Sequence, residues 1–164
     1  MRVAALGALA AIALLAGGCG SSSKTPGSKG GSVSKASFIA SADAICHTSE
    51  VALAPVLARE SATLSAKPQK VAAGAAALDQ ASAIIRTGVG RLRALAEPSA
   101  DAGTLAKMFG AVSNEAAALN SYASALRRHD TAAESTAASE ISAYSTLYTG
   151  IAKTYGFKHC GHGS

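Results

Sequence analysis

Hydrophobic residues recur at helical spacing through most of the chain after residue 36, which predicts helices there. Two inner segments carry aliphatic residues at strict seven-residue intervals. One starts near Pro68 and reaches about residue 96, and the other follows "EPSAD" and ends near Arg128. The repeating residues are Val71, Leu78, Ile85 and Leu92 in the first, and Leu105, Val112, Leu119 and Leu126 in the second.

Two further helices are predicted on either side of these segments. The first, over residues 36–64, contains Pro55, which is expected to kink it. The last opens at "DTAAE", where Thr131 and Glu134 have the spacing of a capping box, and Gly156 is placed to end it. Their predicted core residues are Phe38, Ile39, Ile45, Cys46, Ala52, Leu53, Val56 and Leu57, and then Ile141, Tyr144, Tyr148, Ile151 and Tyr155.

Four helices joined by short breaks predict an all-α fold, an antiparallel up-down-up-down four-helix bundle over residues 36–164. Five glycines interrupt the predicted helices. They indicate either close approach of helix backbones, which is favoured, or a pocket left where side chains are missing. These glycines are Gly74, Gly88, Gly90, Gly110 and Gly150.

The first eighteen residues have the pattern of an export signal. Arg2 precedes an apolar run over residues 3–16, which is shorter than the roughly 20 residues that a membrane-spanning helix needs. Small residues then lead directly to Cys19, an arrangement that resembles the lipobox of bacterial lipoproteins. In that family the cysteine is acylated and becomes the first mature residue. The alternative is an ordinary secreted protein cut at the same place, which would leave Cys19 as a reactive free thiol.

Residues 19–35 are rich in glycine and serine, a composition typical of a disordered tether. Its lysines, Lys24, Lys29 and Lys35, either touch anionic lipid headgroups or only keep the tether soluble. These lysines and Arg2 supply four of the five net positive charges, because residues 36–164 carry 11 basic and 10 acidic residues. A nearly neutral domain is not expected to bind nucleic acid.

Cysteines and histidines gather at one end of the predicted bundle. In this topology the start of the first helix and the end of the last lie together, so an exported chain is expected to join Cys46 to Cys160 in a disulfide. Zinc and copper bind histidine and cysteine, but a disulfide leaves only the histidines as ligands. No metal site is therefore predicted, and the candidate ligands are His47, His159 and His162. His129 is expected in a loop at the opposite end.

No motif for catalysis or for a cofactor is found in the sequence. It lacks the Glu-x-x-His of di-iron bundles, the Cys-x-x-Cys-His of covalent haem, the Gly-x-Ser-x-Gly elbow and the phosphate-binding glycine loop. Acidic residues occur singly along the predicted helices rather than in pairs. The chain is therefore predicted not to be an enzyme, with no catalytic residues and no cofactor.

Two stretches, "FIASADAIC" at residues 38–46 and "YGFKHCG" at residues 155–161, resemble actinobacterial cell-envelope lipoproteins of uncharacterised function. The resemblance implies a helical domain closed by a disulfide and carried on a lipid anchor. His159 departs from it, since an apolar residue such as valine is expected there.

These patterns together predict a non-enzymatic binding or scaffolding module, exported by the general secretory route and anchored by lipid to the outer face of the cell membrane. Its candidate partners are an envelope protein or a small ligand. The two alternatives are a carrier of a small apolar ligand between the helices and an envelope metal-binding protein that uses the histidines near the disulfide.

Overall fold

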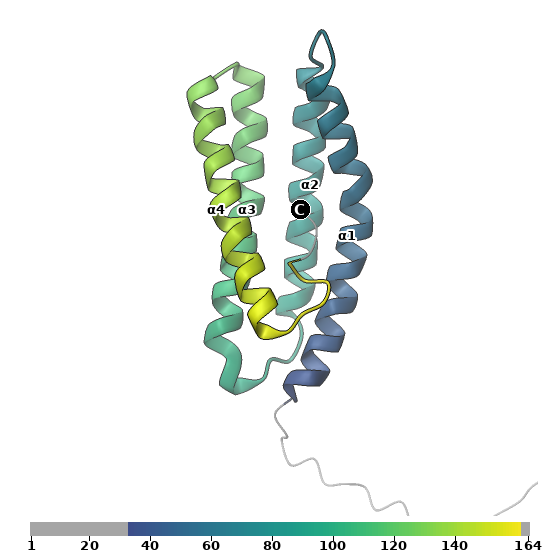
Figure 1. Ribbon diagram of the computed structural model, residues 1–164, viewed down its shortest axis with the longest axis vertical. Helices are drawn as coiled ribbons and strands as arrows, with labels where there is room; N and C mark the ends of the chain where they lie inside the picture. Colours follow the sequence, from purple (N-terminus) through teal and green to yellow (C-terminus); the bar gives the residue numbers. More distant parts are fainter. Residues whose placement is uncertain (1–32, 162–164) are drawn as a thin grey trace, which may run out of the picture. The chain divides into compact units, whose positions relative to one another are not determined.

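The computed structural model describes residues 33–161, which form an antiparallel four-helix bundle (Figure 1). The helices are α1 (Lys35–Ser65), α2 (Val71–Arg93), α3 (Ala102–Arg128) and α4 (Thr131–Tyr155), and the short 3-10 helix η1 (Ser99–Asp101) precedes α3. The predicted fold class is confirmed. The predictions for the signal peptide, Cys19, most of the tether and His162 fall outside the described residues.

The helix ends differ from the predicted ones in two places. Helix α2 begins at Val71 and not near Pro68, because the preceding residues turn through a cis Lys67–Pro68 bond and the Lys70 N–H bonds back to the Thr63 carbonyl at 3.0 Å. Helix α4 has no Thr131 capping box. Instead Asp130 accepts a hydrogen bond from the Ala133 N–H at 3.0 Å, which leaves Thr131 as the first helical residue.

The structure shows what happens at Pro55 in the first helix and at Gly156 after the last. Pro55, which was expected to kink α1, lies on the exposed side of the helix and does not end it. Helix α4 ends where predicted, at Gly156, whose φ of 105° lies in the left-handed region that favours glycine. None of the described helices is both long enough and apolar enough to span a membrane.

Heptad residues contribute to the core, and α3 supplies more of its buried residues than any other helix. All four predicted residues of α3 are buried, whereas only Leu78 and Leu92 of the four in α2 are fully buried. In α4 the predicted stripe faces the core but is less deeply buried. Tyr155 is buried, and Ile141, Tyr148 and Ile151 are half-buried and pack against the core clusters. Ala52 of α1, also predicted in the core, is exposed.

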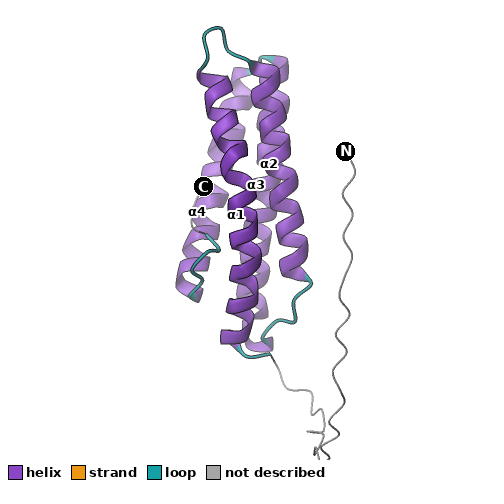
Figure 2. Ribbon diagram, turned by 90° about the vertical axis from the view of Figure 1, so that its right-hand side faces the viewer, coloured by secondary structure: helices purple, strands orange, loops and turns teal. Residues whose placement is uncertain are grey.

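The partial burial of α4 follows from the way the helices are arranged. Each helix packs on its neighbour in sequence, and no Cα atom of α1 lies within 8 Å of a Cα atom of α4. Successive connections lie at opposite ends of the bundle (Figure 2). The seam between α1 and α4 is crossed by residues 156–161, named here the C-terminal segment, which leaves the end of α4 and runs to α1 (Figure 1).

The five helical glycines divide into two groups. Gly74 and Gly88 mark close approach of α2 to α1, since a Cβ atom added at Gly88 would lie 2.7 Å from the Ser49 Oγ and one at Gly74 would clash with Leu64. An added Cβ atom at Gly90, Gly110 or Gly150 would have nothing within 4 Å. The prediction of close packing is therefore confirmed for two of these glycines and wrong for three.

Candidate functional site

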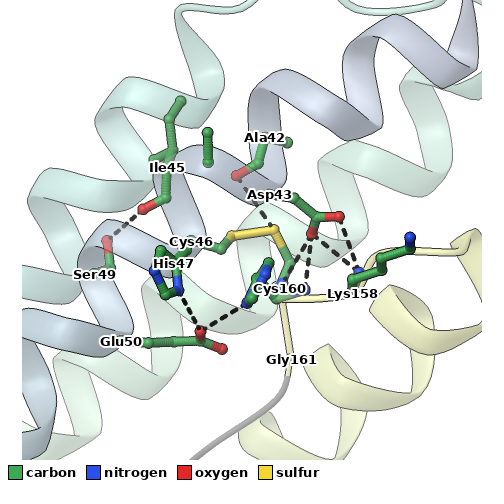
Figure 3. The surroundings of a disulfide bond; sticks show 12 residues. Ala42, Asp43, Ile45, Cys46, His47, Ser49, Glu50, Lys158, Cys160 and Gly161 are labelled. Carbon is green, nitrogen blue, oxygen red and sulfur yellow. Dashed lines mark hydrogen bonds and ion pairs between the residues drawn. A yellow bond between two sulfur atoms is a disulfide. The ribbon is translucent and has the colours of Figure 1, made fainter.

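The C-terminal segment is fastened to α1 by a disulfide and by one buried carboxylate (Figure 3). Cys46 and Cys160 are bonded, with their Cα atoms 5.1 Å apart, as the sequence predicts. Asp43 lies one turn earlier on α1 and is 8% exposed. Its carboxylate accepts hydrogen bonds from the backbone N–H groups of Lys158, His159 and Cys160, at 2.9–3.3 Å. The backbone of this stretch is thus fixed on helix α1.

The same segment is held to α4 from its other side. The Gly161 N–H donates to the Tyr148 hydroxyl at 3.0 Å. Burial raises the pKa of Tyr148 to about 12. Gly161 has φ 81°, and a Cβ atom added there would lie 2.8 Å from the Cβ of Ala152. A side chain at position 161 would therefore meet both backbone strain and a collision with α4.

Aromatic rings close this end of the bundle next to the start of α1. The ring of Phe38 makes edge contacts with Tyr155 and Phe157, which stack on each other. The Tyr155 hydroxyl donates to Asp101 at 2.7 Å, and the Lys35 Nζ lies 4.0 Å from the centre of the Tyr155 ring. Lys35, predicted as a tether residue, is therefore the first residue of α1 and packs on the domain.

The disulfide places two of the three candidate histidines side by side. His47 and His159 each adjoin a bonded cysteine, and their ring centres lie 4.7 Å apart. The Glu50 Oε2 lies 3.8 Å from the Nδ1 of His47, which Figure 3 shows beside it, and 3.2 Å from the Nδ1 of His159. These three residues, named here the histidine–glutamate cluster, hold donor atoms within 4.8 Å of one another.

The meeting of His47 and His159 at one end of the bundle was predicted from the sequence, whereas the place of Glu50 beside them was not. The signal that could have found it is the spacing of His47 and Glu50, which places both on one face of a helix. His129 ends α3 at the opposite end, as predicted. The histidine–glutamate cluster is half-exposed, with 60% of the His47 side chain, 45% of His159 and 26% of Glu50 accessible.

A cavity of about 80 Å³ lies between the helices beneath this cluster. Most of its wall is aliphatic, with side chains from α1, α2 and α3 that include Ile45, Val89 and Val112. No lysine or arginine side chain of the described residues lines it. Its polar lining residues are Ser49, Glu50, Glu115, Tyr148 and His159. The sequence left open a pocket where the helical glycines leave side chains out. A cavity is present, but Gly88 is the one of these five glycines that lines it, and its lining includes acidic residues.

The two carboxyl groups of the cavity have little solvation. Glu115 is 6% exposed, and burial raises its pKa to about 6, against the lowering effect of a hydrogen bond with Ser145. The Glu50 Oε1 is buried and has no hydrogen-bond partner among the described residues. Buried carboxylate oxygens without partners are costly, so this lining favours a group that is positively charged or donates hydrogen bonds.

Glu115 is expected to make the protein less stable as the pH rises from about 4.5 to 6. Its pKa is raised on folding, so the unfolded chain binds fewer protons than the folded one in this window. We expect the free energy of unfolding to fall by on the order of 1 kcal/mol. Urea unfolding at several pH values measures it. Glu115→Gln should remove this part of the slope, and an unchanged slope in that variant would contradict the assignment.

Comparison with known proteins finds no match: no family model, no curated protein and no solved structure resembles the chain.

Proposed function

We propose that the chain is a lipid-anchored, extracytoplasmic binding module of the bacterial envelope, whose cavity receives a small ligand with an apolar body and a positively charged end. The anchor is inferred from the short apolar run and the small residues that precede Cys19. The disulfide supports export, since such bonds persist in oxidising compartments. No catalytic role is part of the proposal.

The acidic apolar cavity is the observation that carries the proposed ligand class. Its aliphatic wall favours a hydrocarbon group, and its volume suits a small one. Glu50 and Glu115 place two carboxyl groups in the lining, and the buried Oε1 of Glu50 has no hydrogen-bond partner among the described residues, so a neutral hydrocarbon leaves that oxygen uncompensated. An alkylammonium ion satisfies both requirements, because its charged end can donate hydrogen bonds to these oxygens.

Native mass spectrometry of the full chain, extracted from membranes in detergent, tests the anchor and the ligand together. The mass should match a chain that begins at Cys19 with acyl groups and one disulfide. Butylammonium at pH 7 should add as one molecule per chain, and butanol, which has a similar shape but no charge, should add far less. Glu115→Gln should weaken the butylammonium complex.

Two results would contradict the proposal. A chain that begins elsewhere, or that carries no acyl group, would refute the lipid anchor. Equal binding of butanol and butylammonium, or no binding of either, would refute the cationic ligand class and direct the search to protein partners, which crosslinking in intact cells would identify.

A further inference from the structure

We propose that His47, Glu50 and His159 form a binding site for a borderline divalent transition-metal ion, with Zn²⁺ as its test ion. This site shares Glu50 and His159 with the cavity lining, and metal binding to it can be measured without any cavity ligand present. Its donors are one nitrogen from each imidazole and the Oε2 of Glu50.

The distances between the donor atoms fit a tetrahedral ion. Zinc binds histidine nitrogen and carboxylate oxygen at about 2.0–2.2 Å, which puts neighbouring ligand atoms about 3.3–3.5 Å apart. The Glu50 Oε2 lies 3.2 Å from the His159 Nδ1 and 3.8 Å from the His47 Nδ1. The full set spans at most 4.8 Å, so a small rotation of two half-exposed rings brings all three donors to coordination distance.

The fold holds these donors in place before any ion binds. His47 and Glu50 stand one turn apart on α1, a rigid element. His159 comes from the C-terminal segment, whose backbone is fixed by the Asp43 carboxylate and by the disulfide. A metal ion therefore needs to order only three side chains, which reduces the entropic cost of binding.

Beside the distances between the donor atoms, the surroundings of the Glu50 carboxylate also favour a cation at this site. Its Oε1 is buried without a hydrogen-bond partner among the described residues, and its Oε2 is faced by two imidazole nitrogens. A cation between the rings and the carboxylate would compensate this charge, and carboxylates that bind metal through one oxygen or both are common.

The donor set selects the class of metal. Two imidazoles and one carboxylate suit zinc, copper(II) and nickel, whereas magnesium and calcium prefer oxygen ligands alone. The thiolates that would favour copper(I) are absent from this cluster, because Cys46 and Cys160 are bonded to each other. Three protein ligands leave the fourth position of a tetrahedral ion for water or for an incoming ligand, so the ion can be exchanged from solution.

Isothermal titration of the full-length, disulfide-bonded chain with Zn²⁺, without a polyhistidine tag, tests this site. We expect one ion per chain in the wild type. His159→Ala and Glu50→Gln should each weaken binding by about tenfold or more, because each removes one of three metal–ligand bonds. The pair His47→Ala with His159→Ala should abolish binding. Co²⁺ should give the visible absorption of a low-coordinate site in the wild type and lose it in the pair.

A matched control separates this site from general histidine effects. His129→Asn removes a histidine at the other end of the bundle and keeps a residue that tolerates the left-handed φ of 54° at that position. This variant should bind Zn²⁺ like the wild type. Circular dichroism melts establish that each variant is folded. The proposal is overturned if the wild type binds no Zn²⁺, or if the double variant binds it as tightly as the wild type.

Discussion

Replacing both Cys46 and Cys160 by alanine is expected to lower the free energy of unfolding by about 4–5 kcal/mol. The bond joins positions 114 residues apart, and a loop of that length restricts the unfolded chain strongly in the chain-entropy account of disulfide stability. The loss is a large fraction of the 5–15 kcal/mol typical of a whole domain. The disulfide also matters for the folded state, because it fastens the C-terminal segment across the seam between α1 and α4.

Guanidinium unfolding followed by circular dichroism measures this loss. The double variant avoids a free thiol, and the wild type after chemical reduction should match it within error. The helices should still form at low temperature, since the contacts between sequence neighbours are unchanged. A loss below about 1 kcal/mol would show that the disulfide does little to limit the unfolded chain.

Asp43→Ala is expected to destabilise the protein by about 3 kcal/mol. Asp43 is buried, and its carboxylate accepts hydrogen bonds from three consecutive backbone N–H groups of the C-terminal segment. A hydrogen bond to a charged group contributes about 1.5–3 kcal/mol to stability. In Asp43→Ala the backbone N–H groups of residues 158–160 lose their acceptor while they remain partly buried. Asp43→Asn keeps one acceptor oxygen, so its effect should be smaller.

Urea unfolding gives the size of this effect, and hydrogen exchange shows where it acts. The amides of residues 158–160 should exchange faster in Asp43→Ala than in the wild type. Asp79→Ala is the matched control, because Asp79 is 44% exposed and pairs with Arg127 on the surface, so its loss should be at most about 1 kcal/mol. Asp43 and the disulfide hold the same segment, so their combined loss should differ from the sum. Unchanged exchange at residues 158–160 would contradict this role.

The heptads of α2 and α3 allowed the fold to be predicted from the sequence, because both helices lie in the middle of the bundle with a neighbour on each side. The prediction was weakest for α4. Its tyrosines and isoleucines have core spacing, but a helix that packs on one neighbour buries only a narrow stripe. Sequence periodicity records which face is apolar and does not record how many helices will cover that face.

The site was only half predictable for a related reason. The disulfide followed from the topology, and it necessarily brings His47 and His159 together. Asp43 could not be assigned, because a single acidic residue in a helix has no pattern that separates a surface charge from one beneath another segment, and the spacing of Glu50 from His47 was the one signal that the sequence offered for Glu50. Their roles depend on the path of the C-terminal segment over α1, which hydrophobic periodicity does not determine.

The order of helix contacts also affects how this domain reaches its folded state. Most contacts between helices join elements adjacent in sequence, so most steps of assembly close only a short loop and demand little chain entropy, and the contact of Phe38 with Tyr155 is an exception. Much of the bundle can therefore form by association of neighbouring helices. The contacts across the seam between α1 and α4, and the disulfide between Cys46 and Cys160, are what join the two distant ends of the domain.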